Sequence, residues 1–401
     1  MTEFLSHRPH CLAGRVTAVV SAKGYAHDGT SMVCKIYHPE VQRRHEGRTV
    51  QVIHRIAEEP NTDMHKHLPS VLFYADLPGC TTQRIRSVIK RGWKGDRTLR
   101  IIGLKKLNKI TSVEGAAFIK AWLEAIGCHA FLWKHYVEHG DPSVTNLMYD
   151  PETKCGVLSD FDLSILQWEP RVFGTDRTGT VPFMANDLLE DGYWQGKIRR
   201  FFHHELESFI WILAYVSLVY DKGIRKRNAQ VDAWTTSDYN VCRQKKSDFY
   251  KPRHLDGLAG QVQPTYQIYW PLIRTLCFGL AAYQGRNDQR YYTRRVELKH
   301  NSKNTASSDP AIPNFAVGPV VFDPCVDVAS AFATESSEDL WNVFLTAFTS
   351  TNLDQDQDLL NISEILTCLR AQKPSFDPLT NDKKELRKQY HFVINGISQL
   401  G

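Results

Sequence analysis

The chain has 401 residues, of which 42% are hydrophobic, 11% aromatic and 23% charged. This composition is typical of a globular protein, and it excludes a collagen, a coiled coil or a chain that is disordered throughout. The length predicts at least two packed units, since a domain usually holds about 150 residues.

The net charge of +5 is concentrated in two stretches of the chain. Residues 84–97 hold six Lys or Arg against one Asp, and residues 286–304 hold six against two acids. Both stretches contain Gly, Ser, Asn or Thr, so we expect solvated loops there. Because the rest of the chain is slightly acidic, a positive field over the whole surface is not expected, and nucleic acid is not a predicted partner.

The nine cysteines follow no regular spacing and contain no Cys-x-x-Cys pair. This pattern favours reduced thiols in a cytoplasmic or nuclear protein over a disulfide framework or a zinc site. The first residues lack the apolar stretch of a signal peptide. The longest apolar run, residues 209–220, is shorter than the ~18 residues needed to cross a bilayer, so no membrane association is expected.

The first 107 residues are predicted to form a small, strand-rich lobe with one main helix. Residues 16–37 are rich in β-prone side chains and are interrupted by glycines, which indicates strands joined by hairpin turns. Helical spacing over residues 41–57 predicts a helix, and Pro60 follows it. Two further strands are expected at 71–75 and 99–104.

Residues 108–401 are predicted to form a larger, mainly helical lobe. The elements expected there are a long helix over 118–133 that ends near His135, two short strands at 147–149 and 157–158, a buried helix over 201–220, and helices at 339–348 and 359–369. Residues 222–264 and 286–338 carry few aliphatic side chains and are interpreted as insertions, the second of them disordered near residues 301–313.

The residues that carry chemistry lie in two short segments, 139–146 and 157–162. The first contains Asp141 and Asn146 in a loop after a helix, and the second places Asp160 in a loop after a strand. Magnesium takes oxygen ligands from one or two carboxylates, an amide and substrate phosphates. With Asn146 and Asp160 as metal ligands, Asp141 is left to accept a proton from a hydroxyl, which is the division of roles in phosphoryl transfer by kinases.

Several sequence blocks in a fixed order resemble the fungal-type protein kinases of the protein-kinase-like superfamily. The blocks are residues 8–17 around Gly14, Val33-Cys34-Lys35, His139 to Asn146, Asp160-Phe161-Asp162-Leu163, Arg177 to Ala185, and His204 to Phe209. They span residues 8 to about 220. The resemblance implies an α+β, two-lobed protein-kinase-like fold, with a small antiparallel β-sheet lobe that binds nucleotide and a helical catalytic lobe.

The resemblance also implies roles for residues of the first lobe. Lys35 is expected to hold the phosphates of ATP and to pair with Glu46, although Glu40 is an alternative partner. Gly14 belongs to the strand that covers the phosphates, and Lys105 to Leu107 correspond to the hinge whose backbone meets adenine.

In the second lobe the resemblance implies catalytic roles for Asp141, Ser143, Asn146 and Thr180. Thr180 is expected to contact Asp141 and to shape the peptide site. Ser143 stands where Ser/Thr protein kinases usually carry Lys, and it matches the fungal-type group. The expected cofactors are ATP and Mg²⁺.

Three further positions depart from the usual kinase pattern. Gly14 is the only glycine in the strand over the phosphates, and Asp162 replaces the glycine after Phe161. Gly140 replaces the Arg that precedes the catalytic Asp in many kinases and that clamps a phosphorylated activation segment. Control through phosphorylation of Thr175 or Thr178 is therefore less expected.

These features predict a Mg·ATP-dependent Ser/Thr protein kinase that acts on a protein substrate. Two alternatives remain open. Gly140 also fits a small-molecule kinase of the aminoglycoside or choline kinase type, although those enzymes lack the block at residues 179–185. The low glycine content over the phosphates, Asp162 and the Ser143 that replaces the catalytic-loop Lys fit a catalytically weak pseudokinase or scaffold. The pairs His65/His67 and His203/His204 lack cysteines or carboxylates at zinc spacing and are interpreted as surface or core residues.

Overall fold

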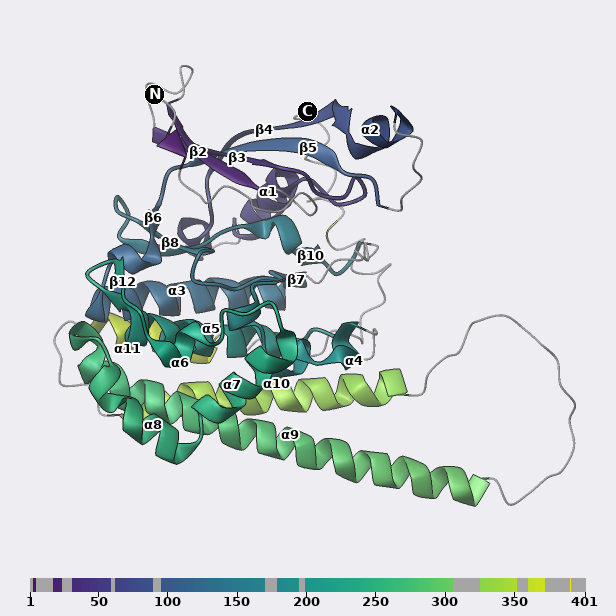
Figure 1. The fold of residues 1–401 in the computed structure, drawn as a ribbon, viewed down its shortest axis with the longest axis vertical. Coiled ribbons are helices and arrows are strands. Elements are labelled where there is room, and N and C mark those ends of the chain that lie inside the picture. The colour runs from purple at the N-terminus through teal and green to yellow at the C-terminus, as the bar shows by residue number, and fades with distance from the viewer. Residues whose placement is uncertain are drawn as a thin grey trace, which may run out of the picture.

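The computed structural model describes residues 3–4, 17–23, 31–58, 62–88, 95–169, 179–194, 199–305, 325–351, 360–371 and 390. These residues form two lobes, with a β-sheet lobe lying against a larger helical lobe (Figure 1). The α+β, two-lobed, kinase-like fold that the sequence predicts is therefore confirmed.

The small lobe is built on a five-stranded antiparallel sheet with the strand order β1-β2-β3-β5-β4. Its strands are β1 (Glu3–Phe4), β2 (Ala18–Lys23), β3 (Ser31–Tyr37), β4 (Val71–Thr81) and β5 (Thr98–Lys105). The helix α1 (Glu46–Ile56) packs against β4 and buries its apolar face. It begins five residues later than the predicted 41, because the ring of His45 caps it by accepting from the N–H of Gly47.

A short helix, α2 (Thr82–Val88), occupies part of the basic stretch that was expected to be a loop. The carboxylate of Asp96 accepts hydrogen bonds from the Thr82 hydroxyl at 2.9 Å and from the Gln83 N–H at 2.6 Å, so it caps the start of this helix. The prediction was wrong here because the cap comes from Asp96, a residue outside the helix near the end of the basic stretch.

The large lobe is centred on two buried helices, α3 (Gly115–Lys134) and α5 (Phe202–Val219). The indole N–H of Trp122 on α3 donates to the carbonyl of Phe209 on α5 at 3.0 Å. Two small sheets lie beside them: β6 (Asn108–Lys109) with β8 (Leu147–Asp150) and β9 (Cys155–Leu158), and β7 (Val137–Glu138) with β10 (Ile165–Leu166). The loops that follow β7 and β9 carry the chemistry predicted from the sequence.

Residues 222–264 form part of the helical core. They include α6 (Ala229–Asp232), α7 (Tyr239–Phe249) and α8 (Pro252–Leu258). Trp234 and Phe249 are buried, and they make edge-to-face contacts with Trp211 of α5 and with each other. Aromatic side chains supply the buried apolar surface of this segment. Its low aliphatic content therefore does not indicate a segment outside the core.

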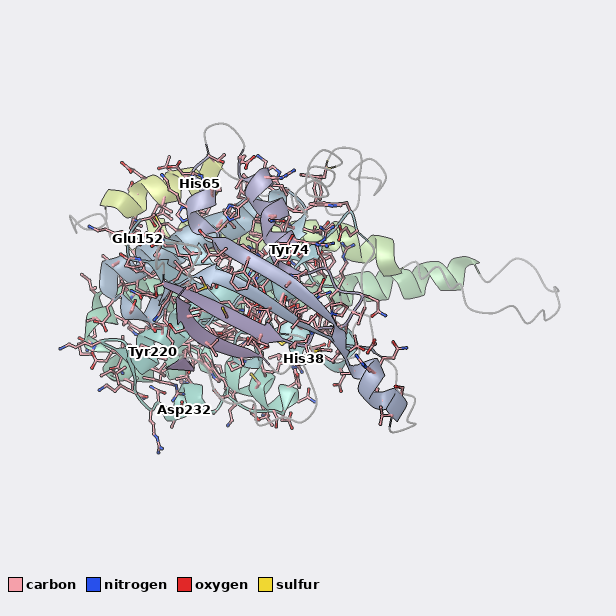
Figure 2. All side chains as sticks on the ribbon, turned by 90° about the horizontal axis from the view of Figure 1, so that it is seen from above. His38, His65, Tyr74, Glu152, Tyr220 and Asp232 are labelled. Carbon is pink, nitrogen blue, oxygen red and sulfur yellow. The ribbon has the colours of Figure 1, made fainter. Side chains whose placement is uncertain are left out.

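Two long helices, α9 (Trp270–Thr305) and α10 (Cys325–Thr349), pack against each other and project beyond the rest of the lobe (Figure 1, and from above in Figure 2). Both oxygens of Asp339 on α10 accept from Arg286 on α9, at 2.8 and 2.9 Å. The predicted loop at 286–304 is therefore wrong, because this stretch continues α9. Of the segment expected to be disordered, residues 301–305 are helical, and 306–313 lie outside the described residues.

The remaining elements are short, apart from α11 (Leu360–Ala371), which packs on α3. They are η1 (Met64–His67), η2 (Ile110–Ser112), η3 (Phe161–Leu163), η4 (Val181–Phe183), η5 (Asn186–Leu189), α4 (Asp191–Trp194), β11 (Tyr220–Asp221), β12 (Ile224–Arg225), η6 (Ala259–Gln261) and η7 (Pro264–Tyr269). Among the described helices, none combines the length and apolar character that a bilayer span requires.

Candidate active site

Lys35 lies between two carboxylates where the lobes meet. It belongs to β3, and its Nζ donates to Glu46 of α1 at 2.8 Å and to Asp160, which follows β9, at 2.7 Å. The lysine is 6% exposed. Glu40, the alternative partner considered from the sequence, instead pairs with Arg43 and Arg97. The structure thus joins Lys35, Glu46 and Asp160 into one ionic cluster.

The charges of Lys35 and Asp160 stabilise each other, whereas burial and the neighbouring carboxylates of Asp160 and Asp162 raise the pKa of Glu46. Burial alone would lower the pKa of Lys35, but the carboxylates of Asp160 and Glu46 outweigh burial and raise it well above its ordinary value. Burial would likewise raise the pKa of Asp160, whereas the charge and hydrogen bond of Lys35 hold it below its ordinary value. Lys35 is therefore a cation and Asp160 an anion at neutral pH.

Glu46 also connects α1 to the segment after Asp160. Its second carboxylate oxygen accepts from the backbone N–H of Phe161 at 3.2 Å. Asp160 itself has a left-handed backbone, with φ of 66°, and its side chain accepts from the N–H of Asp162 at 3.4 Å. The buried ring of Phe161 packs at its edge against His139, with the centroids 4.9 Å apart. These contacts fix the position of Asp160 relative to both lobes.

Asp141 is held by Thr180, as the resemblance implies. The N–H of Thr180 donates to Oδ1 of Asp141 at 2.7 Å, and its hydroxyl donates to Oδ2 at 3.1 Å. Burial and the nearby negative charge of Asp160 raise the pKa of Asp141, while the Thr180 hydrogen bonds and the charge of Arg200 oppose that rise. The influence of Asp160 shows that the two carboxylates lie within electrostatic reach.

Asn146 links the two loops. Its side-chain Nδ2 donates to the backbone carbonyl of Asp141 at 2.9 Å. Its backbone carbonyl accepts from the N–H of Ser159 at 2.8 Å. Ser159 directly precedes Asp160, so Asp141, Asn146 and Asp160 are brought together by backbone contacts. The hydroxyl of Ser143 is buried and lies 3.0 Å from that of Thr145, so it supports the loop from inside.

Glu205 anchors the backbone of the Asp141 loop, a role that sequence reasoning missed. Its carboxylate accepts from the N–H of Gly140 at 2.7 Å and from the N–H of His139 at 3.2 Å. It also lies 2.6 Å from Nε2 of His129 and 3.5 Å from Arg200. Burial would raise the pKa of Glu205, but the contacts with His129 and the charge of Arg200 lower it to about 2.

Arg200 completes this anchor and was also missed. Its guanidinium is buried and donates to the backbone carbonyl of Gly140, while Glu205 takes the N–H of the same residue. Gly140 has a φ of 90°, and a Cβ there would lie 2.6 Å from the carbonyl oxygen of Leu163. The position usually held by Arg in kinases therefore accepts no side chain here, and a cation reaches the loop from the start of α5 instead.

The predicted adenine-binding residues lie at the end of β5. The N–H of Lys105 donates to the carbonyl of Ser70 at 3.0 Å, so it is already used inside the sheet. The side chain of Lys105 pairs with Asp150 and Glu152 of the large lobe. Leu107 follows in the connection to β6 and is half-buried. Gly14 lies outside the described residues, as do Thr175 and Thr178.

The donor set of the site fits a magnesium ion. Asp160 offers a carboxylate and Asn146 an amide oxygen, which are the hard oxygen ligands that magnesium prefers. Lys35 lies beside Asp160 as a cation for phosphate oxygens. These residues could hold Mg·ATP between the lobes.

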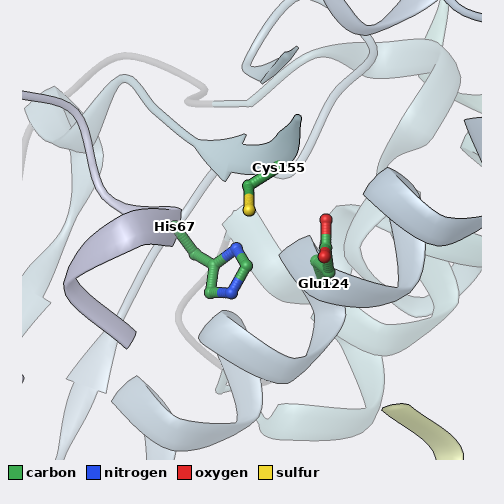
Figure 3. A group of neighbouring side chains, drawn as sticks. All are labelled: His67, Glu124 and Cys155. Carbon is green, nitrogen blue, oxygen red and sulfur yellow. The ribbon is translucent and has the colours of Figure 1, made fainter. Parts of the chain in front are cut away.

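A second cluster of ligand-type side chains is contributed by η1, α3 and β9 (Figure 3). Atoms of His67, Glu124 and Cys155 lie within 4.8 Å of one another. However, Nδ1 of His67 lies 2.8 Å from the carbonyl of Gly156, and Glu124 accepts from the Gly156 N–H at 2.7 Å. Burial also raises the pKa of the Cys155 thiol. These contacts explain the cluster as a clamp on the Gly156 peptide of β9.

His203 and His204 form a buried hydrogen-bonded pair beside Asp187. Nδ1 of His204 accepts from the N–H of Phe201 at 2.9 Å, so the proton of its neutral ring lies on Nε2, 3.0 Å from Nε2 of His203. If Nε2 of His204 bound a metal, the ring proton would move to Nδ1, where it would face the N–H of Phe201. The interpretation of this pair as core residues therefore agrees with the structure.

Comparison with known proteins finds one family model that matches part of the chain, and solved structures with a weak likeness to it. Residues 103–217 match the family described as "Fungal protein kinase". No curated protein matches the chain. The solved structures that match include vaccinia related kinase 3, with 13% sequence identity, a TM-score of 0.35, and coverage of 59% of this chain and 70% of that one. The family match confirms the resemblance to fungal protein kinases that the motifs indicated, and together with the two-lobed fold it supports a protein kinase.

Proposed function

We propose that this protein is a Mg·ATP-dependent kinase that transfers the γ-phosphoryl group to Ser or Thr hydroxyls of a protein substrate. The observation that carries the proposal is the convergence of three groups: the Lys35–Glu46–Asp160 cluster, the Asp141–Thr180 contact, and Asn146 between them. These groups come from both lobes. The proposal includes residues 1–107 as the nucleotide-binding lobe and residues 108–401 as the catalytic lobe.

Asp141 is the proposed base. A carboxylate held by two hydrogen bonds from Thr180 has a fixed orientation, which favours proton transfer from a hydroxyl placed beside it. Asn146 and Glu205 keep the loop backbone in place, so they preserve this orientation. Ser143 supports the same loop through Thr145.

Lys35 is the proposed phosphate ligand, and Asp160 and Asn146 are the proposed magnesium ligands. When bound, magnesium would neutralise charge that develops on the phosphate oxygens. Lys35 already lies beside Asp160, so a phosphate and a metal held by these two side chains would be neighbours. Leu107, at the connection between the lobes, is the remaining candidate for the adenine contact.

A protein substrate and Ser/Thr specificity rest on the resemblance to fungal protein kinases and on the described part of the segment after Asp160. Residues 179–185 contact both Asp141 and the large lobe: Thr180 holds Asp141, and the buried ammonium of Lys246 donates to the carbonyl of Met184. A segment anchored in this way can present a peptide to Asp141. Small-molecule kinases of the aminoglycoside or choline type lack this block.

The test compares phosphate transfer by the full chain with transfer by Asp160→Asn and Asp141→Asn. Each variant should lose at least 100-fold in rate on a degenerate Ser/Thr peptide mixture with Mg·ATP. Thermal unfolding with ATP and Mg²⁺, compared with ATP and EDTA, should show magnesium-dependent stabilisation of the wild type. Stabilisation without transfer would favour the pseudokinase alternative, and transfer by Asp160→Asn at the wild-type rate would refute its metal role.

A further inference from the structure

Glu169 makes an ionic contact between the lobes that the proposed reaction does not use. It follows β10 in the large lobe, where its N–H donates to the carbonyl of Leu166 at 2.9 Å. Arg44 of the small lobe binds both of its carboxylate oxygens, with Nε donating to Oε2 at 3.1 Å and Nη2 donating to Oε1. A bidentate contact of this kind is stronger and more directional than a single ionic hydrogen bond.

Arg44 is positioned to act on α1. It directly precedes His45, which caps α1, and Glu46, which is its first residue. The carbonyl of Arg44 accepts from the guanidinium of Arg100 at 3.1 Å, and Arg100 is itself paired with Asp76 of β4. The backbone of Arg44 is therefore tied to the sheet while its side chain reaches the large lobe.

The start of α1 is held at two points by one segment of the large lobe. Glu46 accepts from the N–H of Phe161, and Arg44 binds Glu169 eight residues further along. If α1 rotated away from the sheet, both contacts would break, and Glu46 would leave Lys35. The Arg44 and Glu169 side chains are 25% and 28% exposed, so solvent weakens their contact only in part.

We propose that Glu169 is a built-in anion that keeps α1 docked through Arg44, so that this pair positions Glu46 on Lys35 without a phosphate on the segment after Asp160. Many kinases order this segment by pairing a phosphate with arginine. A carboxylate forms the same type of charge-assisted contact permanently. The catalytic consequence rests on the proposed kinase function, whereas the docking of α1 does not.

Gly140 is consistent with this inference. Where other kinases have an Arg before the catalytic Asp to bind a segment phosphate, this loop has a glycine that accepts no side chain. Arg200 fills the space behind the loop but is buried and bound to Gly140 and Glu205. Among the described residues, Arg44 is a cation of the small lobe that meets this segment, and its partner there, Glu169, is already an acid.

The experiment uses the phosphatase-treated full chain and two readouts. The first is hydrogen exchange of the α1 amides, residues 46–56, and the second is phosphate transfer from Mg·ATP to a degenerate Ser/Thr peptide mixture. Glu169→Gln and Arg44→Glu should each raise α1 exchange about five- to tenfold and lower transfer by a similar factor. The swapped pair, Arg44→Glu with Glu169→Arg, should return both readouts to within about threefold of the wild type.

The matched control is Asp63→Asn, which breaks an exposed ion pair with Lys66 and should leave both readouts unchanged. Wild-type exchange in α1 for Glu169→Gln would overturn the inference, as would a phosphatase-treated wild type whose α1 loses its protection. If the wild type transfers no phosphate but α1 exchange still responds to these variants, the proposed function fails and the docking contact stands.

Discussion

Replacing Gly140 with alanine tests how the Asp141 loop is built. The φ of 90° costs an alanine about 1–2 kcal/mol, because its Cβ meets the backbone in this conformation. The new Cβ would also lie 2.6 Å from the Leu163 carbonyl oxygen, and forcing backbone apart in a packed region costs about 1–3 kcal/mol. We therefore expect Gly140→Ala to lower the free energy of unfolding by roughly 2–5 kcal/mol.

The same substitution should reduce activity by more than its effect on folding explains. The N–H of Gly140 is bonded to Glu205, and the next residue is the proposed base, Asp141. A shift of the peptide by about 1 Å misplaces that carboxylate, and errors of this size cost about 100-fold in rate. Under conditions where the variant is fully folded, we expect transfer to fall by roughly that factor.

The assay is urea unfolding at constant pH, with transfer rates measured at low urea. The matched control is Gly257→Ala: Gly257 lies in α8, has no positive φ and has no atom within 4 Å of an added Cβ. That change should be neutral or stabilising by up to about 1 kcal/mol. A Gly140→Ala variant within about 0.5 kcal/mol of the wild type and fully active would show that the loop does not require glycine.

Three further outcomes follow from the buried charges. Glu205→Gln leaves the buried Arg200 without its carboxylate, so we expect urea unfolding to show a loss of about 3–5 kcal/mol. Arg200→Ala should lower the rate of phosphate transfer about tenfold with an unchanged KM for ATP, because the Gly140 carbonyl loses its donor. Added guanidinium ion should restore part of the rate. Full activity of this variant without guanidinium would contradict the role of Arg200. Burial lowers the pKa of His203 well below its ordinary value and that of His204 to about 3. The unfolded chain therefore takes up protons below about pH 6.5 while the folded pair stays neutral, so stability should fall by about 2–3 kcal/mol between pH 7 and 5.5.

The control for the histidine outcome is His203→Phe, whose stability should fall less steeply over the same interval because one titrating ring is absent. Urea unfolding at several pH values measures both slopes. Equal slopes for the variant and the wild type would show that the acid sensitivity comes from other groups.

Much of the site was predictable because its residues follow the ends of periodic elements. Lys35 lies on a strand, Glu46 opens the following helix, and Asp160 follows a short strand, so their meeting follows from the order of elements. The choice between Glu46 and Glu40 was not settled by spacing alone. Glu40 is drawn to Arg43 and Arg97, and the latter lies at the far end of the basic stretch, where periodicity gives no information.

The residues that were missed act on the backbone of another segment. Glu205 and Arg200 bond to the N–H and carbonyl of Gly140, which is 60 or more residues away. Any residue type carries those backbone groups, so no pattern at position 140 marks them. The glycine itself was the available signal, because a loop position that needs a positive φ must be held by partners from elsewhere. The aromatic burial of Trp234 was missed for a different reason, since aliphatic content underestimates it.

Two sets of contacts hold the site although no Arg precedes Asp141. The first concerns the loop itself: Arg200 and Glu205 fix the Gly140 peptide from inside the large lobe, whatever the state of the segment after Asp160. The second concerns α1, which Arg44 and Glu169 join to the large lobe. Because neither contact includes a phosphate, the ionic cluster around Lys35 can form in the unmodified chain.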